Sequence, residues 1–355
     1  MSDTHDDIIS DAATKIFADL CEPRTVNDAE HGIWPATLWN TLEESGLTLT
    51  WVPDDLGGAG AEMRDGFAVL KVAGRFASPV PVAETMLAGL LLARAKISSP
   101  SGPMTIAPVH ALTRISLSAD GTLQGSARDV PFARQAQHIA VLARRGDTPV
   151  IALVARAACH ISEGKSLAGE PQDDVSFNGV KPLAVKDAPA GLDEDGLCAL
   201  GATVRCVQMA GALQRILDQS VQYAGERVQF GRPIGKFQAV QHNLAQLAGE
   251  TAAAGVAADA AADAVTKGSL TDEDVMAVIA TAKIRVGDAA TSGSMIAHQA
   301  HGAMGFTYEH SLHQSTRRLW SWREEFGNEA VWAMRLGRIV AARGADELWP
   351  FLASN

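Results

Sequence analysis

The stretch that decides the fold runs from residue 211 to residue 242 and reads GALQRILDQSVQYAGERVQFGRPIGKFQAVQH. Its helical pattern continues to about Arg227, a turn rich in glycine and proline follows at 231–235, and a second helical pattern begins near Phe237. Such a corner can present Arg227 and Gln238 side by side to an anion, because a guanidinium pairs well with phosphate. The residues alone leave open a plain helix-helix connection with a solvated arginine.

Outward from this stretch, the chain changes its hydrophobic period twice. Helical spacing dominates the first hundred residues and everything after about residue 195, and alanine-rich segment 251–265 suits closely packed helices. Between them a period of two indicates strands, mostly antiparallel because no helical crossover separates them. We therefore predict a mainly helical α+β chain of three domains: an N-terminal helical domain at 1–103, a middle antiparallel β-domain at 104–190 and a C-terminal four-helix bundle at 191–355.

Composition narrows the class of protein. With 355 residues, 47% of them hydrophobic and 20% charged, the chain has the composition of a folded globular protein. Its 30 basic and 41 acidic residues give a net charge of −11, which disfavours nucleic-acid binding. Four cysteines without CxxC spacing indicate buried thiols in a reducing compartment. An acidic N-terminus and no apolar run of about 18 residues predict a cytoplasmic protein without a membrane segment.

The corner at Arg227, with YAGERVQFGRPI followed by FQAVQ, resembles the signature of the acyl-CoA dehydrogenase family. Three other blocks are similar to that family: VPDDLGGAG at 52–60, RFASPVPVAET at 75–85 and QAHGAMGFTYEH at 299–310. The second of these resembles the short bacterial forms that degrade steroid or other cyclic acyl-CoA substrates. The resemblance covers nearly the whole chain and implies the family's three-part fold.

The resemblance also implies a function. Members are FAD-dependent oxidoreductases of fatty acid or steroid catabolism that introduce a double bond between Cα and Cβ of an acyl-CoA. They work in tetramers and pass electrons to an electron-transfer flavoprotein. The resemblance assigns contacts with FAD, usually a neighbouring subunit's FAD, to six residues of this chain: Arg227, Phe230, Gln238, Gln299, Gly302 and Ala303.

Two departures from the family pattern concern the rest of the site. The Thr-Glu-Pro-x-x-Gly-Ser-Asp stretch, which holds the flavin in typical members, is missing between Leu90 and Gln124. The usual catalytic glutamate aligns with Phe326, and the alternative family location aligns near Gly201, so neither position offers an acid. A phenyl ring cannot take the α-proton.

Several assignments therefore stay open. Glu325 is the nearest candidate base, although one residue on a helix turns the side chain by about 100°; Glu324 and Glu329 are weaker candidates. Arg205, on the helix nearest the expected thioester, is a candidate CoA contact or an ordinary surface arginine. The alternative to a self-sufficient enzyme is a catalytically silent subunit that completes the FAD site of a partner acyl-CoA dehydrogenase subunit, in a homo- or hetero-tetramer.

Two other features have structural interpretations. His310 and His313 lie beside Glu309, but no third ligand is evident, and we predict no metal site. The late tryptophans at 320, 322 and 332 are more typical of a bundle core or a subunit contact than of a ligand stack.

Overall fold

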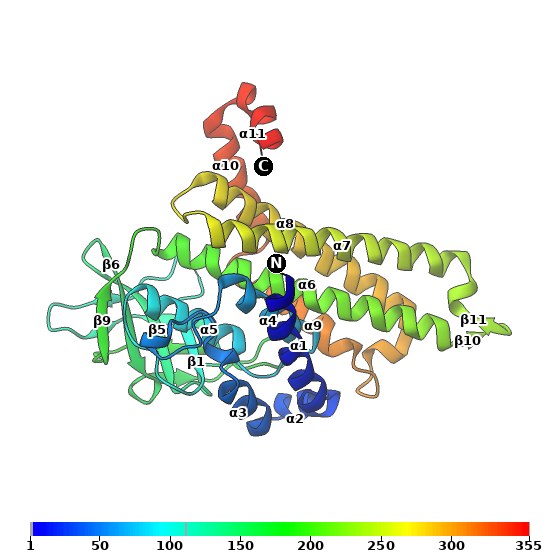
Figure 1. The fold of residues 1–355 in the computed structure, drawn as a ribbon, viewed down its shortest axis with the longest axis horizontal. Coiled ribbons are helices and arrows are strands. Elements are labelled where there is room, and N and C mark those ends of the chain that lie inside the picture. The colour runs from blue at the N-terminus through cyan, green and yellow to red at the C-terminus, as the bar shows by residue number, and fades with distance from the viewer. Residues whose placement is uncertain (1–2, 111, 355) are drawn as a thin grey trace. The chain divides into compact units, whose positions relative to one another are not determined.

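The protein is described by a computed structural model that covers residues 3–110 and 112–354. The chain forms two compact units. Unit 1 comprises Met1–Leu70, Ser78–Gly201 and Ser269–Thr271, and unit 2 comprises Lys71–Ala77, Ala202–Gly268 and Asp272–Asn355. The order of helices, strands and helices confirms the predicted fold class (Figure 1).

The helices of unit 1 follow local sequence signals. Pro23 stands in the first turn of its helix, where a missing N–H costs no hydrogen bond. The Oγ1 atom of Thr85 donates to the carbonyl of Met104 at 3.1 Å and accepts from the amide of Met104 at 3.0 Å, which ties the fifth helix to the first strand. The helices are α1 (Asp3–Leu20), α2 (Pro23–Glu30), α3 (Ala36–Glu44), α4 (Met63–Arg75, which ends in unit 2) and α5 (Val82–Arg94).

Two sheets follow in the middle of the chain. The larger has the order β3-β2-β5-β6-β9, with β1 also paired to β5, and the smaller has the order β4-β8-β7. Most neighbours are antiparallel, as predicted, but β5 pairs in parallel with both β1 and β2. The strands are β1 (Met104–Ala107), β2 (Ser116–Leu117), β3 (Leu123–Gln124), β4 (Ser126–Pro131), β5 (His138–Arg145), β6 (Thr148–Ala155), β7 (His160–Ser162), β8 (Gln172–Ser176) and β9 (Ala184–Asp187).

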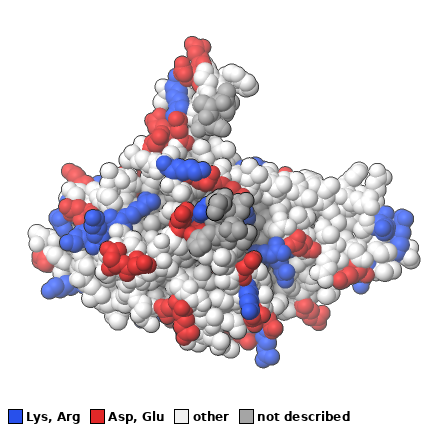
Figure 2. All heavy atoms as spheres, in the orientation of Figure 1, with Lys and Arg blue, Asp and Glu red and all other residues white. Residues whose placement is uncertain are grey.

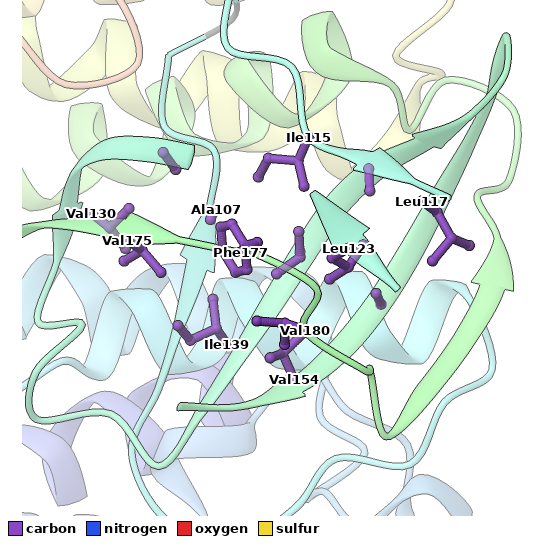
Figure 3. Close-up of a cluster of buried hydrophobic side chains, with 14 of the residues drawn as sticks. Ala107, Ile115, Leu117, Leu123, Val130, Ile139, Val154, Val175, Phe177 and Val180 are labelled. Atoms are coloured by element: carbon purple, nitrogen blue, oxygen red, sulfur yellow. The ribbon is translucent and has the colours of Figure 1, made fainter. Parts of the chain in front are cut away.

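The two sheets share one hydrophobic core. Phe177, which follows β8, packs among the inward side chains of both sheets, including Ile139 of β5 and Val130 of β4 (Figure 3). The alternation of more and less buried residues in β8 matches the period of two read from the sequence, whereas a register shift between Ala127 and Val130 interrupts it in β4.

Unit 2 is built on three long helices, α6 (Glu194–Glu226, whose first turns belong to unit 1), α7 (Gln238–Lys267) and α8 (Glu273–His301) (Figure 1). They meet at Gly293 of α8, where a Cβ atom would lie 3.0 Å from Leu213 of α6 and 3.2 Å from Leu247 of α7. A larger residue at Gly293 would therefore have to push the helices apart.

Shorter elements complete unit 2. They are β10 (Val228–Gln229), β11 (Arg232–Pro233), the 3₁₀ turns η4 (Ile234–Lys236) and η5 (Gly302–Phe306), and the helices α9 (Leu312–Trp322), α10 (Glu329–Arg343) and α11 (Leu348–Ser354). Two helices begin at side-chain caps: Asp272 accepts from the amide of Asp274 at the start of α8, and Asn328 accepts from the amide of Val331 at the start of α10.

One helix, α6, is long and apolar enough to cross a bilayer by length and composition, but its most apolar 18-residue window is completely buried in the protein. That burial is typical of a core helix. On the face drawn in Figure 2, acidic and basic side chains are interspersed rather than gathered by sign.

Candidate functional site

The corner that decides the fold is a tight hairpin between α6 and α7. β10 and β11 pair antiparallel, with Gln229 opposite Arg232, so that Phe230 and Gly231 form a two-residue turn. Both have positive φ, +52° and +78°, as a type I′ turn requires. Gly231 adopts this conformation freely, whereas Phe230 does so at a cost in backbone strain. The hairpin thus holds the phenyl ring of Phe230 at its tip.

The three candidate residues of this corner face solvent. Phe230 is 91% exposed, and Arg227 and Gln238 are exposed as well. Among the described residues, neither the guanidinium of Arg227 nor the amide of Gln238 has a hydrogen-bond or ion-pair partner. An exposed phenyl ring beside polar side chains that form no hydrogen bond within the described chain is typical of a surface that another molecule covers.

The second predicted block forms the end of α8 and the turn η5. Gln299 lies in the last turn of the helix, and Gly302 ends it with φ of +58°, a value that favours glycine. A Cβ atom at Gly302 would meet nothing within 4 Å, so the backbone here is open. Gln299, Gly302 and Ala303 are all exposed.

The structure brings these two blocks together. The ring of Tyr223, one helical turn before Arg227, stacks on the ring of His301, with centroids 4.5 Å apart and planes inclined by 25°. His301 directly precedes Gly302. The arginine corner and the glycine turn are therefore neighbours in space, although 75 residues separate Arg227 from Gly302 in the sequence.

The residues present fit the phosphates of a dinucleotide. A guanidinium supplies charged donors, the amides of Gln238 and Gln299 supply neutral ones, and the open backbone at Gly302 permits close approach. These groups are exposed on the surface of unit 2, as they must be to contact a ligand that another subunit binds. Their roles in binding FAD stay predictions.

The expected position of the catalytic base is filled by an apolar side chain. Phe326 is 3% exposed, and its backbone has a positive φ of +56°, followed by Gly327 at +90°. The indole Nε1 of Trp332 donates to the carbonyl of Phe326 at 2.9 Å and fixes this turn. No group at position 326 can accept a proton.

Glu325, the candidate base, is engaged in a buried ion pair with Arg205, the candidate CoA contact. Both Nε and Nη2 of Arg205 donate to Oε2 of Glu325, at 2.8 and 2.6 Å. Nη1 of Arg205 donates to Oε1 of Gln208 at 2.5 Å. The two charged side chains are 3% and 6% exposed, so Arg205 does not lie on the surface of its helix.

A second buried cation lies next to this pair. Nζ of Lys283 on α8 donates to the carbonyl of Arg323 at 2.6 Å, with the carbonyl of Trp322 at 3.4 Å. These are carbonyls at the end of α9, where a positive charge is favoured by the helix dipole. The turn that carries Glu325 and Phe326 is thus held from two sides. This arrangement was not predicted, since Lys283 lies in an ordinary helical pattern.

The weaker base candidates have structural partners. Oε2 of Glu324 accepts from Nδ2 of Asn328 at 3.0 Å, and Oε2 of Glu329 accepts from Nη2 of Arg323 at 2.8 Å. In unit 1, where the missing family stretch would follow the first strand, β1 ends at Ala107 and β2 begins only at Ser116.

In the part of the chain that the structure describes, no group of three or more His, Cys, Asp or Glu side chains could hold a metal ion. The four cysteines are free thiols, and burial raises the pKa of Cys206 to about 12, so this thiol stays protonated.

This fold, an N-terminal group of helices, a middle sheet and a C-terminal helical bundle, with an exposed arginine corner beside a glycine turn, defines an acyl-CoA dehydrogenase-type protein. Residues 199–341 match the family described as "Acyl-CoA dehydrogenase, C-terminal domain". The chain belongs to the acyl-CoA dehydrogenase family and resembles its short bacterial members.

Individual relatives agree with this assignment. The chain is 28% identical over 283 residues to the acyl-CoA dehydrogenase IpdE2 of Mycobacterium tuberculosis, covering 79% of this chain and 80% of the relative. Its fold is similar to that of the ChsE4-ChsE5 complex from Mycobacterium tuberculosis, with a TM-score of 0.87, 21% identity and coverage of 97% and 99% of the two chains. It is also similar to the Tcur3481-Tcur3483 steroid acyl-CoA dehydrogenase variant, with a TM-score of 0.84, 23% identity and coverage of 95% and 98%.

Proposed function

We propose that this chain is a subunit of an oligomeric acyl-CoA dehydrogenase that introduces a double bond between Cα and Cβ of a CoA thioester. FAD is its cofactor, as in the family to which the chain belongs, and supplies the hydride acceptor when bound. The observation that carries the proposal is the exposed pairing of the Arg227 corner with the Gly302 turn. These residues would hold the phosphates of FAD at a contact between two subunits.

The reaction needs a carboxylate that takes the α-proton. In this chain the acid nearest to the family position is Glu325, and Arg205 donates two hydrogen bonds to one of its oxygens. A guanidinium partner stabilises the ionised carboxylate and so makes it a weaker base. Glu325 would have to leave Arg205, at the cost of a buried unpaired charge, to reach a substrate.

Because Glu325 is bound to Arg205, the structure favours an enzyme in which another subunit supplies the catalytic base. We infer that this chain completes the FAD site and stabilises an active partner, which supplies the base, within a hetero-tetramer. A homo-tetramer that uses Glu325 is the competing enzyme. In either case a bulky acyl-CoA, such as a steroid or other cyclic thioester, is the proposed substrate class, an electron-transfer flavoprotein is the proposed acceptor, and the cytoplasm is the proposed location.

Flavin content separates the two assemblies. The chain is purified alone and after co-expression with a second acyl-CoA dehydrogenase subunit encoded beside it, and FAD per chain is measured by absorbance. A colourless chain that becomes yellow only with its partner supports the paired enzyme. A yellow homo-tetramer that bleaches on addition of acyl-CoA supports the self-sufficient one, and a chain that never retains FAD contradicts both.

Substitution of Glu325 tests the base directly. Glu325→Gln keeps an acceptor for Arg205 but cannot take a proton, so bleaching of the assembled enzyme should persist if the partner supplies the base. Because the substitution leaves a buried charge unbalanced, circular dichroism must first show that the variant is folded. Loss of bleaching in a folded variant that still binds FAD would identify Glu325 as the base.

A further inference from the structure

Four histidines gather where α8 ends and α9 begins. His298 and His301 lie in the last turns of α8, and His310 and His313 flank the first turn of α9. His298, His301 and His313 are buried, and His310 is half-buried. The proposed reaction uses none of them, yet His301 directly precedes Gly302 of the predicted FAD turn.

Hydrogen bonds place the ring protons of three of these histidines. Nδ1 of His301 lies 2.8 Å from the carbonyl of Ala297, and Nδ1 of His313 lies 2.8 Å from the carbonyl of His310. A carbonyl only accepts, so both Nδ1 atoms carry a proton. Nδ1 of His310 instead accepts from the amide of Leu312 at 3.1 Å, which leaves its proton on Nε2. The His310 bond requires a neutral ring, and the other two bonds are compatible with one.

Ring stacking connects the cluster to the FAD turn. The imidazole of His298 lies between Phe306 and Trp320, at centroid distances of 4.1 and 5.7 Å and with planes inclined by 22° and 15°. His301 stacks on Tyr223 of α6. The rings therefore join α6, α8, η5 and α9 around the turn that presents Gly302.

The surroundings of the cluster offer little to balance a positive charge. Arg215 on α6 repels a positive charge on His310. Other charged or titratable groups close to the four histidines or to their ring partner Tyr223 in the sequence are Asp218 and Tyr223 on α6, Tyr308 and Glu309 before α9, and Arg317 and Arg318 on α9. Of the carboxylates in this set, Asp218 pairs with Arg75, and Glu309 is exposed. In the described chain, no carboxylate bonds to His298, His301 or His310.

Two ring nitrogen atoms of the cluster also have no group in the described chain that accepts a hydrogen bond from them. Nδ1 of His298 and Nε2 of His301 are buried without a hydrogen-bond partner among the described residues. A proton added to either atom would have no acceptor, and it would place a charge within a stack of aromatic rings. Burial lowers the pKa of His298, His301 and His310 from 6.5, and repulsion from neighbouring histidines lowers that of His298 and His310 further.

We propose that these histidines are positioning residues that support the Gly302–Phe306 turn while they are uncharged, and that acidification loosens the turn and weakens the binding of FAD. The consequence for FAD rests on the proposed function, whereas the titration of the cluster does not. Because the pKa values of His298, His301 and His310 are lower in the folded chain than in the unfolded one, the unfolded chain takes up protons first as pH falls. The contribution of the cluster to stability is complete above about pH 6.5 and is lost below it.

Imidazole NMR of the complete chain with ring-labelled histidine tests the titration without any cofactor. We expect His298 and His301 to carry their neutral signals at pH 6.5 and to titrate below it. Exposed His160, observed in the same sample, serves as the solvent-accessible reference signal. Charged His298 and His301 at pH 6.5 would overturn the proposal.

Retention of FAD by the assembled protein tests the consequence. Between pH 7.5 and 5.5 the wild type should lose FAD affinity, by about tenfold for each pH unit over which one ring takes up a proton as FAD leaves. The double variant His298→Gln and His301→Asn keeps amide donors where the rings donate but cannot titrate, so we expect a loss of less than about threefold. His160→Gln is the matched control and should behave like the wild type.

An equal loss of FAD in the wild type and the double variant would refute the support role. If no assembly retains FAD, the proposed function fails, but the cluster is still tested by the pH dependence of thermal unfolding. The double variant should then show a flatter melting-temperature profile below pH 6.5 than the wild type, and an identical profile would refute the inference.

Discussion

Two arginines of unit 2 show opposite uses of the same side chain. Arg205 is buried, donates to Glu325 and Gln208 and helps to fix a turn, whereas the guanidinium of Arg227 is exposed and has no partner among the described residues. A buried guanidinium is committed to its own fold, because removing its partner leaves an unbalanced charge. An exposed, uncommitted one is available to another molecule. The comparison separates the scaffold of this protein from its candidate binding surface.

The largest expected effect comes from breaking the buried pair. Glu325→Leu leaves Arg205 charged and buried, and it should lower the free energy of unfolding by about 3–5 kcal/mol. Urea denaturation followed by circular dichroism measures the change. The double variant Arg205→Met with Glu325→Leu removes both charges and should regain much of the loss; a double variant as unstable as the single one would contradict the ion-pair explanation.

An effect of intermediate size is expected at exposed Arg227, and it should fall on FAD binding, not on folding. Arg227→Ala should weaken FAD retention about tenfold or more, because a hydrogen bond to a charged group contributes about 1.5–3 kcal/mol. Its free energy of unfolding should stay within about 0.5 kcal/mol of the wild type. Arg24→Ala, at another exposed arginine, is the control and should leave FAD binding unchanged. Full FAD occupancy in the Arg227 variant would remove this residue from the site.

The smallest effect is expected at a partly buried ion pair of unit 1, which extends the comparison between buried Arg205 and exposed Arg227. Glu194 accepts from Arg144 at 2.7 and 2.6 Å, and this bonding lowers the pKa of Glu194 below 4.5. Glu194→Gln should cost about 1 kcal/mol or less at pH 7. Because the folded pKa is depressed, the stabilisation is present above pH 4.5 and is lost as pH falls through the lower value.

The difference between wild type and Glu194→Gln should therefore vanish in acid, as measured by denaturation at several pH values. Asp187→Asn is the control, since Asp187 and Arg145 form a pair that is more than half exposed. That substitution should have no measurable effect. A pH-independent cost at Glu194 would mean that the helix start, and not the ion pair, explains it.

Much of the fold could be predicted because it depends on local signals. The helical spacing of the first hundred residues corresponds to α1–α5, and the corner expected between Arg227 and Phe237 joins α6 to α7. The short hairpin inside that corner was not predicted, since two-residue strands leave no periodicity to detect. The parallel pairing of β1 with β5 was missed for a different reason, because it joins strands that are distant in sequence.

The candidate site was only partly predictable. Local motifs identified Arg227 and Gly302, but their proximity depends on the Tyr223–His301 stack, which no motif records. The pairing of Arg205 with Glu325 spans 120 residues and depends on how α6 packs against the turn after α9. Sequence spacing cannot reveal such contacts, because they are set by tertiary packing.

The turn at Phe326 has a consequence for substitution at this position. Its backbone lies at φ +56°, where any residue with a Cβ, glutamate as much as phenylalanine, bears a similar strain. The Trp332 indole that fixes the turn bonds to a backbone carbonyl and is indifferent to the side chain. Exchange of glutamate and phenylalanine at this position would therefore leave the backbone of the turn and its hydrogen bond to Trp332 in place.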